Sequence, residues 1–192
     1  MLNKLKKAAL VGSGLLVLAG CSSESADDAS VNSEAVGAET LVVGLDDTFA
    51  PMGFRDENNE IVGFDVDLAK AVGERIGAEI VFQPIDWAMK ETELDSGNID
   101  MIWNGYAITP ERAEKVLLSE PYIVDAQSII VLKDSAIETK ADLEGKLVST
   151  QQSSSSVDKI MEDDSGIFGK LGGDLVLYPS NNNAFSDLES GR

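Results

Sequence analysis

Blocks of apolar residues alternate with polar stretches along the chain, and their lengths predict short strands separated by helices. The apolar run at residues 41–45 predicts a first strand, and a turn-rich stretch follows it as far as Asn59. Further strands are expected over residues 61–62, 79–82 and 99–103. Because helical patterns fall between these strands, the sequence predicts an α/β fold.

Two helices are predicted between the strands. The first covers residues 65–76, and Gly77 follows it as a stop signal. Its apolar face is expected to consist of Leu68, Val72 and Ile76. The second helix covers residues 87–96 and is closed by Gly97.

A short motif occurs twice, as LDSGN at residues 94–98 and as LESGR at residues 188–192. The first copy leads directly into the strand predicted at residues 99–103. If the two halves of the chain are built alike, the second copy stands just before a strand of the second half. The sequence therefore predicts that the second half is incomplete.

The first 20 residues predict a lipoprotein signal peptide. Lysines precede an apolar run over residues 8–18, which is shorter than the roughly 20 residues that a spanning helix needs. Small residues then stand directly before Cys21, the only cysteine, in an arrangement that resembles the bacterial lipobox. We expect Cys21 to be acylated and to anchor the protein outside the cytoplasm on the cell membrane. The alternative is an unmodified thiol.

Residues 21–38 are rich in Ser, Ala, Asp and Glu and predict an acidic, flexible tether. The folded part is expected to start near Thr40. The whole chain has 34 acidic and 15 basic residues, for a formal net charge of −19. Such an acidic chain is a poor partner for nucleic acid.

Arg112 is the strongest candidate for a binding residue. Thr109 is a good helix N-cap and Pro110 a good first helical residue, which places Arg112 in the first turn. A cation there opposes the helix dipole, and Glu or Gln is the favoured residue at that position. An anionic ligand would resolve the conflict. The alternative is a solvated arginine paired with Glu111 or Glu114.

Several motifs resemble those of the family 3 bacterial extracellular solute-binding proteins. The run GFDVDL at residues 63–68 fits the signature of that family. Other motifs of the family follow its order, at residues 44–46, 49–51, 108–112, 119–122 and 142–146. Residues 86–94 and 102–106 are similar to a branch that takes up amino acids. The resemblance covers about residues 40–192.

The resemblance implies a type II periplasmic-binding-protein-like fold of two α/β lobes joined by a hinge. Lobe 1 is expected over residues 39–126, and a partial lobe 2 over residues 127–192, without its C-terminal strands and return crossover. The implied function is substrate binding for an ABC importer. An amino acid, such as a polar one or cystine, would bind between the lobes and pass to the permease. The resemblance implies no cofactor and no metal.

The resemblance also implies which residues hold the ligand. Arg112 would bind the α-carboxylate through two parallel hydrogen bonds, with help from Gly105, Ala107 and Thr109. Many relatives have a hydroxyl residue where this chain has Ala107, so only the backbone remains there. The acidic partner of the ligand ammonium is expected after Arg192.

Lobe 2 is expected to reach the ligand carboxylate through the serine run at residues 153–156. Ser153 and Ser154 fall where relatives contact the carboxylate, and the hydroxyl of Ser154 is the favoured contributor. A flexible serine loop is the alternative.

The remaining candidates each have a structural alternative. Phe49 and Trp87 align with residues that line the cleft, but both could be core aromatics. Asp46 could accept a hydrogen bond from the ligand or hold the turn after its strand.

An enzyme of the same fold is the competing class, because relatives dehydrate small acids or cleave wall glycans. The chain has no histidine and the sequence shows no nucleophile triad or metal-ligand cluster, which favours binding over catalysis. A third class, the sensor domain of a receptor, would need a membrane span and a signalling region, and neither is predicted from these residues.

Overall fold

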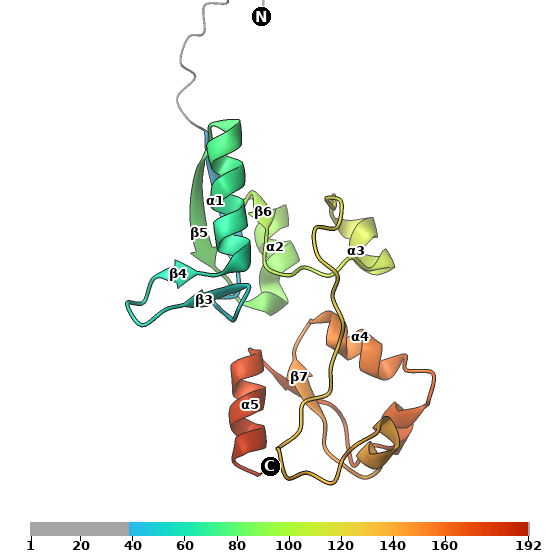
Figure 1. The fold of residues 1–192 in the computed structure, drawn as a ribbon. Helices are drawn as coiled ribbons and strands as arrows, with labels where there is room; N and C mark the ends of the chain where they lie inside the picture. The colour runs from blue at the N-terminus through green and yellow to red at the C-terminus, as the bar shows by residue number, and fades with distance from the viewer. Residues whose placement is uncertain (1–38, 192) are drawn as a thin grey trace, which may run out of the picture. The chain divides into compact units, whose positions relative to one another are not determined.

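The structure is a computed structural model that describes residues 39–191 (Figure 1). The predicted signal peptide, the tether over residues 21–38 and Cys21 lie outside the described residues. Within the described part, no helix is long and apolar enough to cross a membrane.

A parallel sheet of three strands forms the first part of the fold, with the order β5-β1-β6. The central strand β1 (Thr40–Leu45) pairs along its length with β5 (Glu79–Pro84) and at its end with β6 (Met101–Ile102). Val43 and Leu45 are completely buried. The strands predicted at residues 41–45 and 79–82 are confirmed, as expected for buried apolar runs.

Strand β6 is shorter than the predicted strand at residues 99–103. The chain still follows β1 on both sides of it, because Asp100 N donates to Val42 O and Trp103 N donates to Gly44 O. The Asp100 carboxylate accepts a hydrogen bond from Val42 N at 2.7 Å. This side-chain bond uses the backbone N–H of Val42 in β1, and the regular pairing of β6 with β1 begins only after Asp100.

Helix α1 (Phe64–Ile76) confirms the first predicted helix, and Gly77 ends it in the left-handed conformation. Its apolar face is rotated from the expected one: Val66, Ala69 and Gly73 are buried, whereas Ile76 is 61% exposed. Gly73 allows the close approach to β5, since a Cβ there would lie 2.5 Å from Ile80 Cγ1.

The stretch before Asn59 was predicted to consist of turns, and this is wrong in part. It contains β2 (Thr48–Phe49) and β3 (Gly53–Arg55), which form an antiparallel sheet with β4 (Ile61–Val62). Strands of two and three residues are too short to show an alternating pattern, so the turn residues dominate the sequence signal.

The second predicted helix is split into two. A 3₁₀ turn, η1 (Trp87–Met89), is capped by the Asp86 side chain, and α2 (Lys90–Asp95) follows it. Helix α3 (Pro110–Lys115) comes after β6. Short 3₁₀ turns are common at the start of α-helices. The residue pattern of this segment does not distinguish the 3₁₀ turn from the α-helix that follows it.

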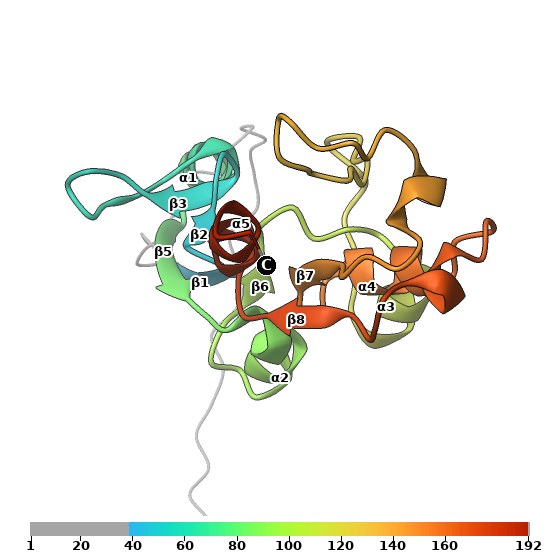
Figure 2. The same cartoon turned by 90° about the horizontal axis from the view of Figure 1, so that it is seen from below.

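The C-terminal part contains a pair of parallel strands, β7 (Ser149–Gln151) and β8 (Val176–Tyr178), side by side in Figure 2. Helices α4 (Ser155–Met161) and α5 (Asn181–Glu189) contact this pair. Two 3₁₀ turns, η2 (Lys140–Leu143) and η3 (Ile167–Lys170), complete the elements.

The repeated motif forms the same structure twice, as the C-terminus of a helix. Ser96 and Ser190 are the C-caps of α2 and α5, and each donates its hydroxyl proton to a carbonyl three residues earlier. Gly97 and Gly191 follow in the left-handed conformation, with φ values of 74° and 81°.

Candidate ligand-binding site

Arg112 lies where the sequence predicts, in the first turn of α3. Thr109 is the N-cap, and its Oγ1 accepts a hydrogen bond from Arg112 N at 3.2 Å. Pro110 occupies the first turn, as expected. The arginine is only 8% exposed, so it is not a solvated surface residue.

The guanidinium of Arg112 contacts uncharged groups. Its Nη1 donates to Ala107 O at 3.1 Å and its Nη2 to Ser153 O at 3.4 Å, and its Cζ lies 4.2 Å from the centre of the Tyr106 ring. Within residues 39–191, no acidic side chain forms an ion pair with Arg112. Glu111 is paired with Lys115 instead.

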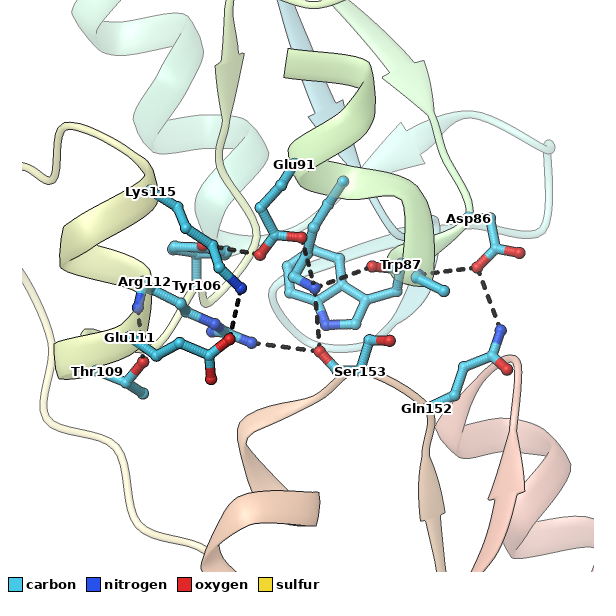
Figure 3. Close-up of polar contacts among 12 residues, drawn as sticks. Asp86, Trp87, Glu91, Tyr106, Thr109, Glu111, Arg112, Lys115, Gln152 and Ser153 are labelled. Carbon is cyan, nitrogen blue, oxygen red and sulfur yellow. Dashed lines mark hydrogen bonds and ion pairs between the residues drawn. The ribbon is translucent and has the colours of Figure 1, made fainter. Parts of the chain in front are cut away.

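Lys90 is a second buried cation, and it is 2% exposed. It meets Arg112 at the carbonyl oxygen of Ser153, which lies beside the Arg112 guanidinium in Figure 3. Its Nζ donates to Trp87 O at 3.2 Å and to Ser153 O at 3.0 Å, and forms an ion pair with Glu91 at 3.1 Å. Burial lowers the pKa of Lys90, because the charged form loses hydration, and the Glu91 carboxylate acts against this shift.

Glu91 and Tyr106 complete the charged cluster. Glu91 Oε1 accepts a hydrogen bond from the Tyr106 hydroxyl at 2.9 Å. Burial by itself would raise the pKa of Glu91, but the hydrogen bond and the charge of Lys90 outweigh it, and the pKa is lowered. Burial and the bond to Glu91 raise the pKa of Tyr106.

Trp87 is buried at 6% exposure and packs edge-on against Tyr106, with ring centres 6.1 Å apart. Lys90 Nζ lies 5.2 Å from the centre of the Trp87 ring. The tryptophan therefore forms an aromatic wall of the cationic cluster. Such a cation above an aromatic face is stabilised by the ring quadrupole.

The serine run reaches the same cluster through its backbone. Ser153 has a φ of 54°, and its carbonyl oxygen accepts hydrogen bonds from both Lys90 and Arg112. The hydroxyl of Ser154, favoured as a ligand contact, here donates to Gln151 O at 2.7 Å. The backbone of the run, rather than its hydroxyl groups, thus contacts the cations.

Asp46 is buried and engages both of its oxygens. Oδ1 accepts from the backbone and the hydroxyl of Thr48, at 2.9 and 2.6 Å, so the carboxylate holds the turn after β1. Oδ2 accepts from Gln151 Nε2 at 2.7 Å. Gln151 is itself 4% exposed and also donates to Pro179 O.

Gly105 has a φ of 56°, and its N–H donates to Asp65 Oδ2 at 2.6 Å. Phe49 covers this glycine, since a Cβ there would lie 3.1 Å from Phe49 Cε1. Asp65 also accepts a hydrogen bond from the Tyr122 hydroxyl at 2.7 Å. Burial raises the pKa of Asp65, while these hydrogen bonds act in the opposite direction.

The structure therefore brings the predicted residue Arg112 together with three others, Trp87, Ala107 and Ser153, in one cluster with Lys90. Gly105 and Phe49 lie against each other, and Asp46 contacts Gln151. Sequence reasoning missed Lys90, Glu91 and Tyr106. The segments that contain them, residues 86–94 and 102–106, resemble those of the amino-acid-uptake branch, but a run of charged residues on a helix is typical of a solvated face and did not single these residues out.

The described residues hold no group of three or more His, Cys, Asp or Glu side chains that could bind a metal ion. The positive charge of the cluster suits an anion. Two buried cations, an aromatic wall and backbone groups are the components of a site for a small carboxylate.

The structure is thus an α/β fold that contains a buried cluster with two cations. Residues 41–187 match the sequence profile of the family described as "Bacterial extracellular solute-binding proteins, family 3". The chain belongs to this family. The fold class that the sequence predicted is confirmed, and so is the resemblance on which it was based.

Known relatives include amino-acid-binding proteins. The L-cystine-binding protein TcyJ of Escherichia coli strain K12 is 28% identical over 194 residues, which is 100% of this chain and 71% of TcyJ. An ABC uptake transporter substrate-binding protein from Streptococcus pneumoniae, solved with bound histidine, is 39% identical with a TM-score of 0.76. The match covers 79% of this chain and 62% of that one, which is less than two thirds of its length.

A third relative connects binding with catalysis. The ancestral amino-acid-binding protein AncCDT-1, described as a precursor of cyclohexadienyl dehydratase, is 34% identical with a TM-score of 0.73. The match covers 80% of this chain and 66% of that chain.

Proposed function

We propose that this protein is the extracytoplasmic substrate-binding component of an ABC importer and that its ligand is an amino acid. Arg112 carries the proposal: it is 8% exposed, and no acidic side chain of residues 39–191 pairs with it. Burying a charge without a partner costs a free energy on the order of several kcal/mol. An anionic ligand bound to Arg112 would offset this cost. A planar carboxylate suits a guanidinium.

The proposed ligand enters between two lobes, residues 39–126 and 127–192. Among the described residues, four hydrogen bonds already join these segments: Lys90 to Ser153, Arg112 to Ser153, Gln151 to Asp46, and Gln152 to Asp86. Lobe 1 would capture the carboxylate through Arg112, and lobe 2 would close over it. The permease would then recognise the closed form.

The proposed location is the outer face of the cell membrane, where acylated Cys21 would hold the protein near its permease. The family is described as extracellular, which supports a site outside the cytoplasm. Named relatives that bind cystine or histidine support an amino-acid ligand.

Calorimetric titration of the full-length protein against the twenty standard L-amino acids and L-cystine tests the proposal. We expect saturable binding of one or a few of them. Arg112→Ala should weaken that binding about 100-fold or more, since a charge-assisted bidentate contact is lost. Lys115→Ala, which removes an exposed cation from the same helix, is the matched control. Retained affinity in Arg112→Ala would overturn the assignment.

An enzyme of the same fold is the second candidate, and the relation to a dehydratase precursor favours this alternative over other enzymes. The chain has no histidine to act as an acid or base. Proton NMR of the ligand after prolonged incubation separates the two functions. Unchanged ligand supports binding, and a dehydrated product would establish catalysis.

A further inference from the structure

Two buried cations converge on a single uncharged oxygen. Lys90 Nζ lies 3.0 Å and Arg112 Nη2 3.4 Å from the carbonyl oxygen of Ser153. Figure 3 shows the Arg112 guanidinium and this carbonyl group facing each other. Lys90 is 2% and Arg112 is 8% exposed. Hydrogen bonds from cations are strongest when the acceptor carries a negative charge, so a neutral carbonyl is a weak acceptor at this position.

The charges around this oxygen leave one positive charge without compensation. Lys90 is paired with Glu91, and on the surface Lys115 is paired with Glu111. Arg112 has no acidic partner within the described part of the chain. One monoanion between Lys90 and Arg112 would balance the cluster.

The group that now occupies this position belongs to an exposed residue of a turn. Ser153 is exposed, and its φ of 54° is one that residues other than glycine seldom adopt. Ser153 belongs to the turn between β7 and α4. Lys90 is the first residue of α2, and Arg112 lies within α3. Movement of this turn would leave the two cations in place and free both donors.

We propose that Lys90 is a ligand-binding residue, which holds the ligand carboxylate together with Arg112 at the position that the Ser153 carbonyl oxygen takes in this structure. The inference rests on the proposed function, because it requires that the ligand carry a carboxylate. Lys90 then makes the site selective for the charged acid over its uncharged derivatives.

The experiment compares each amino acid that binds with its own carboxamide, which keeps the side chain and the ammonium but lacks the negative charge. In the full-length protein, Lys90→Met should weaken binding of the amino acid about 10- to 100-fold and change that of the carboxamide little. Lys90→Arg should keep most of the preference for the acid. Lys115→Met, which removes an exposed cation that does not contact Ser153, should change both affinities much less than Lys90→Met does.

A purely structural lysine gives a different result. If Lys90 only anchors the start of α2 through Trp87 O, Lys90→Met should weaken the binding of both ligands equally, and this outcome overturns the inference. An unchanged affinity for the acid overturns it as well. If the wild-type protein binds no amino acid, the proposed function itself fails, and the inference fails with it.

A measurement on the wild-type protein covers the case in which Lys90→Met does not fold. The ¹⁵N resonance of Lys90 Nζ should shift when the amino acid is added and should shift much less with the carboxamide. Equal shifts with both compounds would contradict a contact between Lys90 and the carboxylate.

Discussion

Single residues in the cluster depend on one another for charge compensation. Lys90 has almost no contact with water, and its one acidic partner among the described residues is Glu91. Glu91 in turn accepts the hydroxyl proton of Tyr106. Removing one charge of a buried pair leaves the other without hydration or a partner, which costs more than the pair contributes.

Glu91→Gln should therefore lower the free energy of unfolding by about 1–3 kcal/mol at neutral pH. Glu111→Gln is the control, because the Glu111–Lys115 pair is exposed and its loss should change the stability much less. Guanidinium titrations of both variants give the measurement. Equal losses would show that Glu91 does not compensate a buried charge.

The lowered pKa of Glu91 also predicts how this effect depends on pH. A carboxyl group whose pKa is lowered on folding stabilises the protein above its unfolded pKa of about 4.5. That contribution is lost as the pH falls through the lower, folded pKa. The stability difference between wild type and Glu91→Gln should thus shrink below about pH 4.5, and a constant difference would contradict this cause.

At the scale of elements, the start of α1 shows how the backbone replaces a side-chain cap. Gly63 is the N-cap, and no side chain caps the helix. Instead, Phe64 N donates to Pro51 O and Asp65 N to Met52 O, both at 2.9 Å. This close approach requires a residue without a Cβ, with a φ of 137°.

Gly63→Ala should destabilise the protein by more than about 2 kcal/mol, because the new Cβ would lie 2.4 Å from Met52 O in addition to the backbone strain. Gly97→Ala is the matched control: Gly97 also has a positive φ, of 74°, but a Cβ there meets nothing within 4 Å. We expect about 1 kcal/mol from this control. Thermal unfolding of both variants measures the difference, and similar losses would exclude the steric cause.

Across the whole molecule, a buried hydrogen bond between Asp46 and Gln151 joins residues 105 positions apart. Asp46 directly follows β1, and Gln151 is the last residue of β7. This bond links the two proposed lobes without using either cation. It is therefore a means to separate the association of the lobes from ligand recognition.

Gln151→Glu should weaken that association at neutral pH, because two carboxylates would then face each other at about hydrogen-bond distance. We expect a larger radius of gyration in small-angle X-ray scattering and faster proteolysis of the segment between the lobes. Adding Asp46→Asn should restore part of the wild-type behaviour, since an amide can again donate to a carboxylate, whereas the hydrogen bond to Pro179 O stays lost. An unchanged radius in Gln151→Glu would show that the two side chains do not meet in solution.

The sequence by itself determined the parts of the fold that depend on neighbouring residues. The apolar runs of β1 and β5, the stop of α1 at Gly77, and the Thr109 cap that places Arg112 in α3 all follow from local rules. These elements were predicted because strand burial, helix ends and caps involve residues only a few positions apart.

Only the tertiary structure decided how the site is assembled. The Ser153 carbonyl oxygen meets Lys90 and Arg112 across 63 and 41 residues of chain, and no local pattern predicts those distances. Lys90 looks like any other lysine of a polar helix until the fold removes it from water. Burial and charge compensation are properties of packed neighbours, and for this reason the sequence found Arg112 but not its second cation.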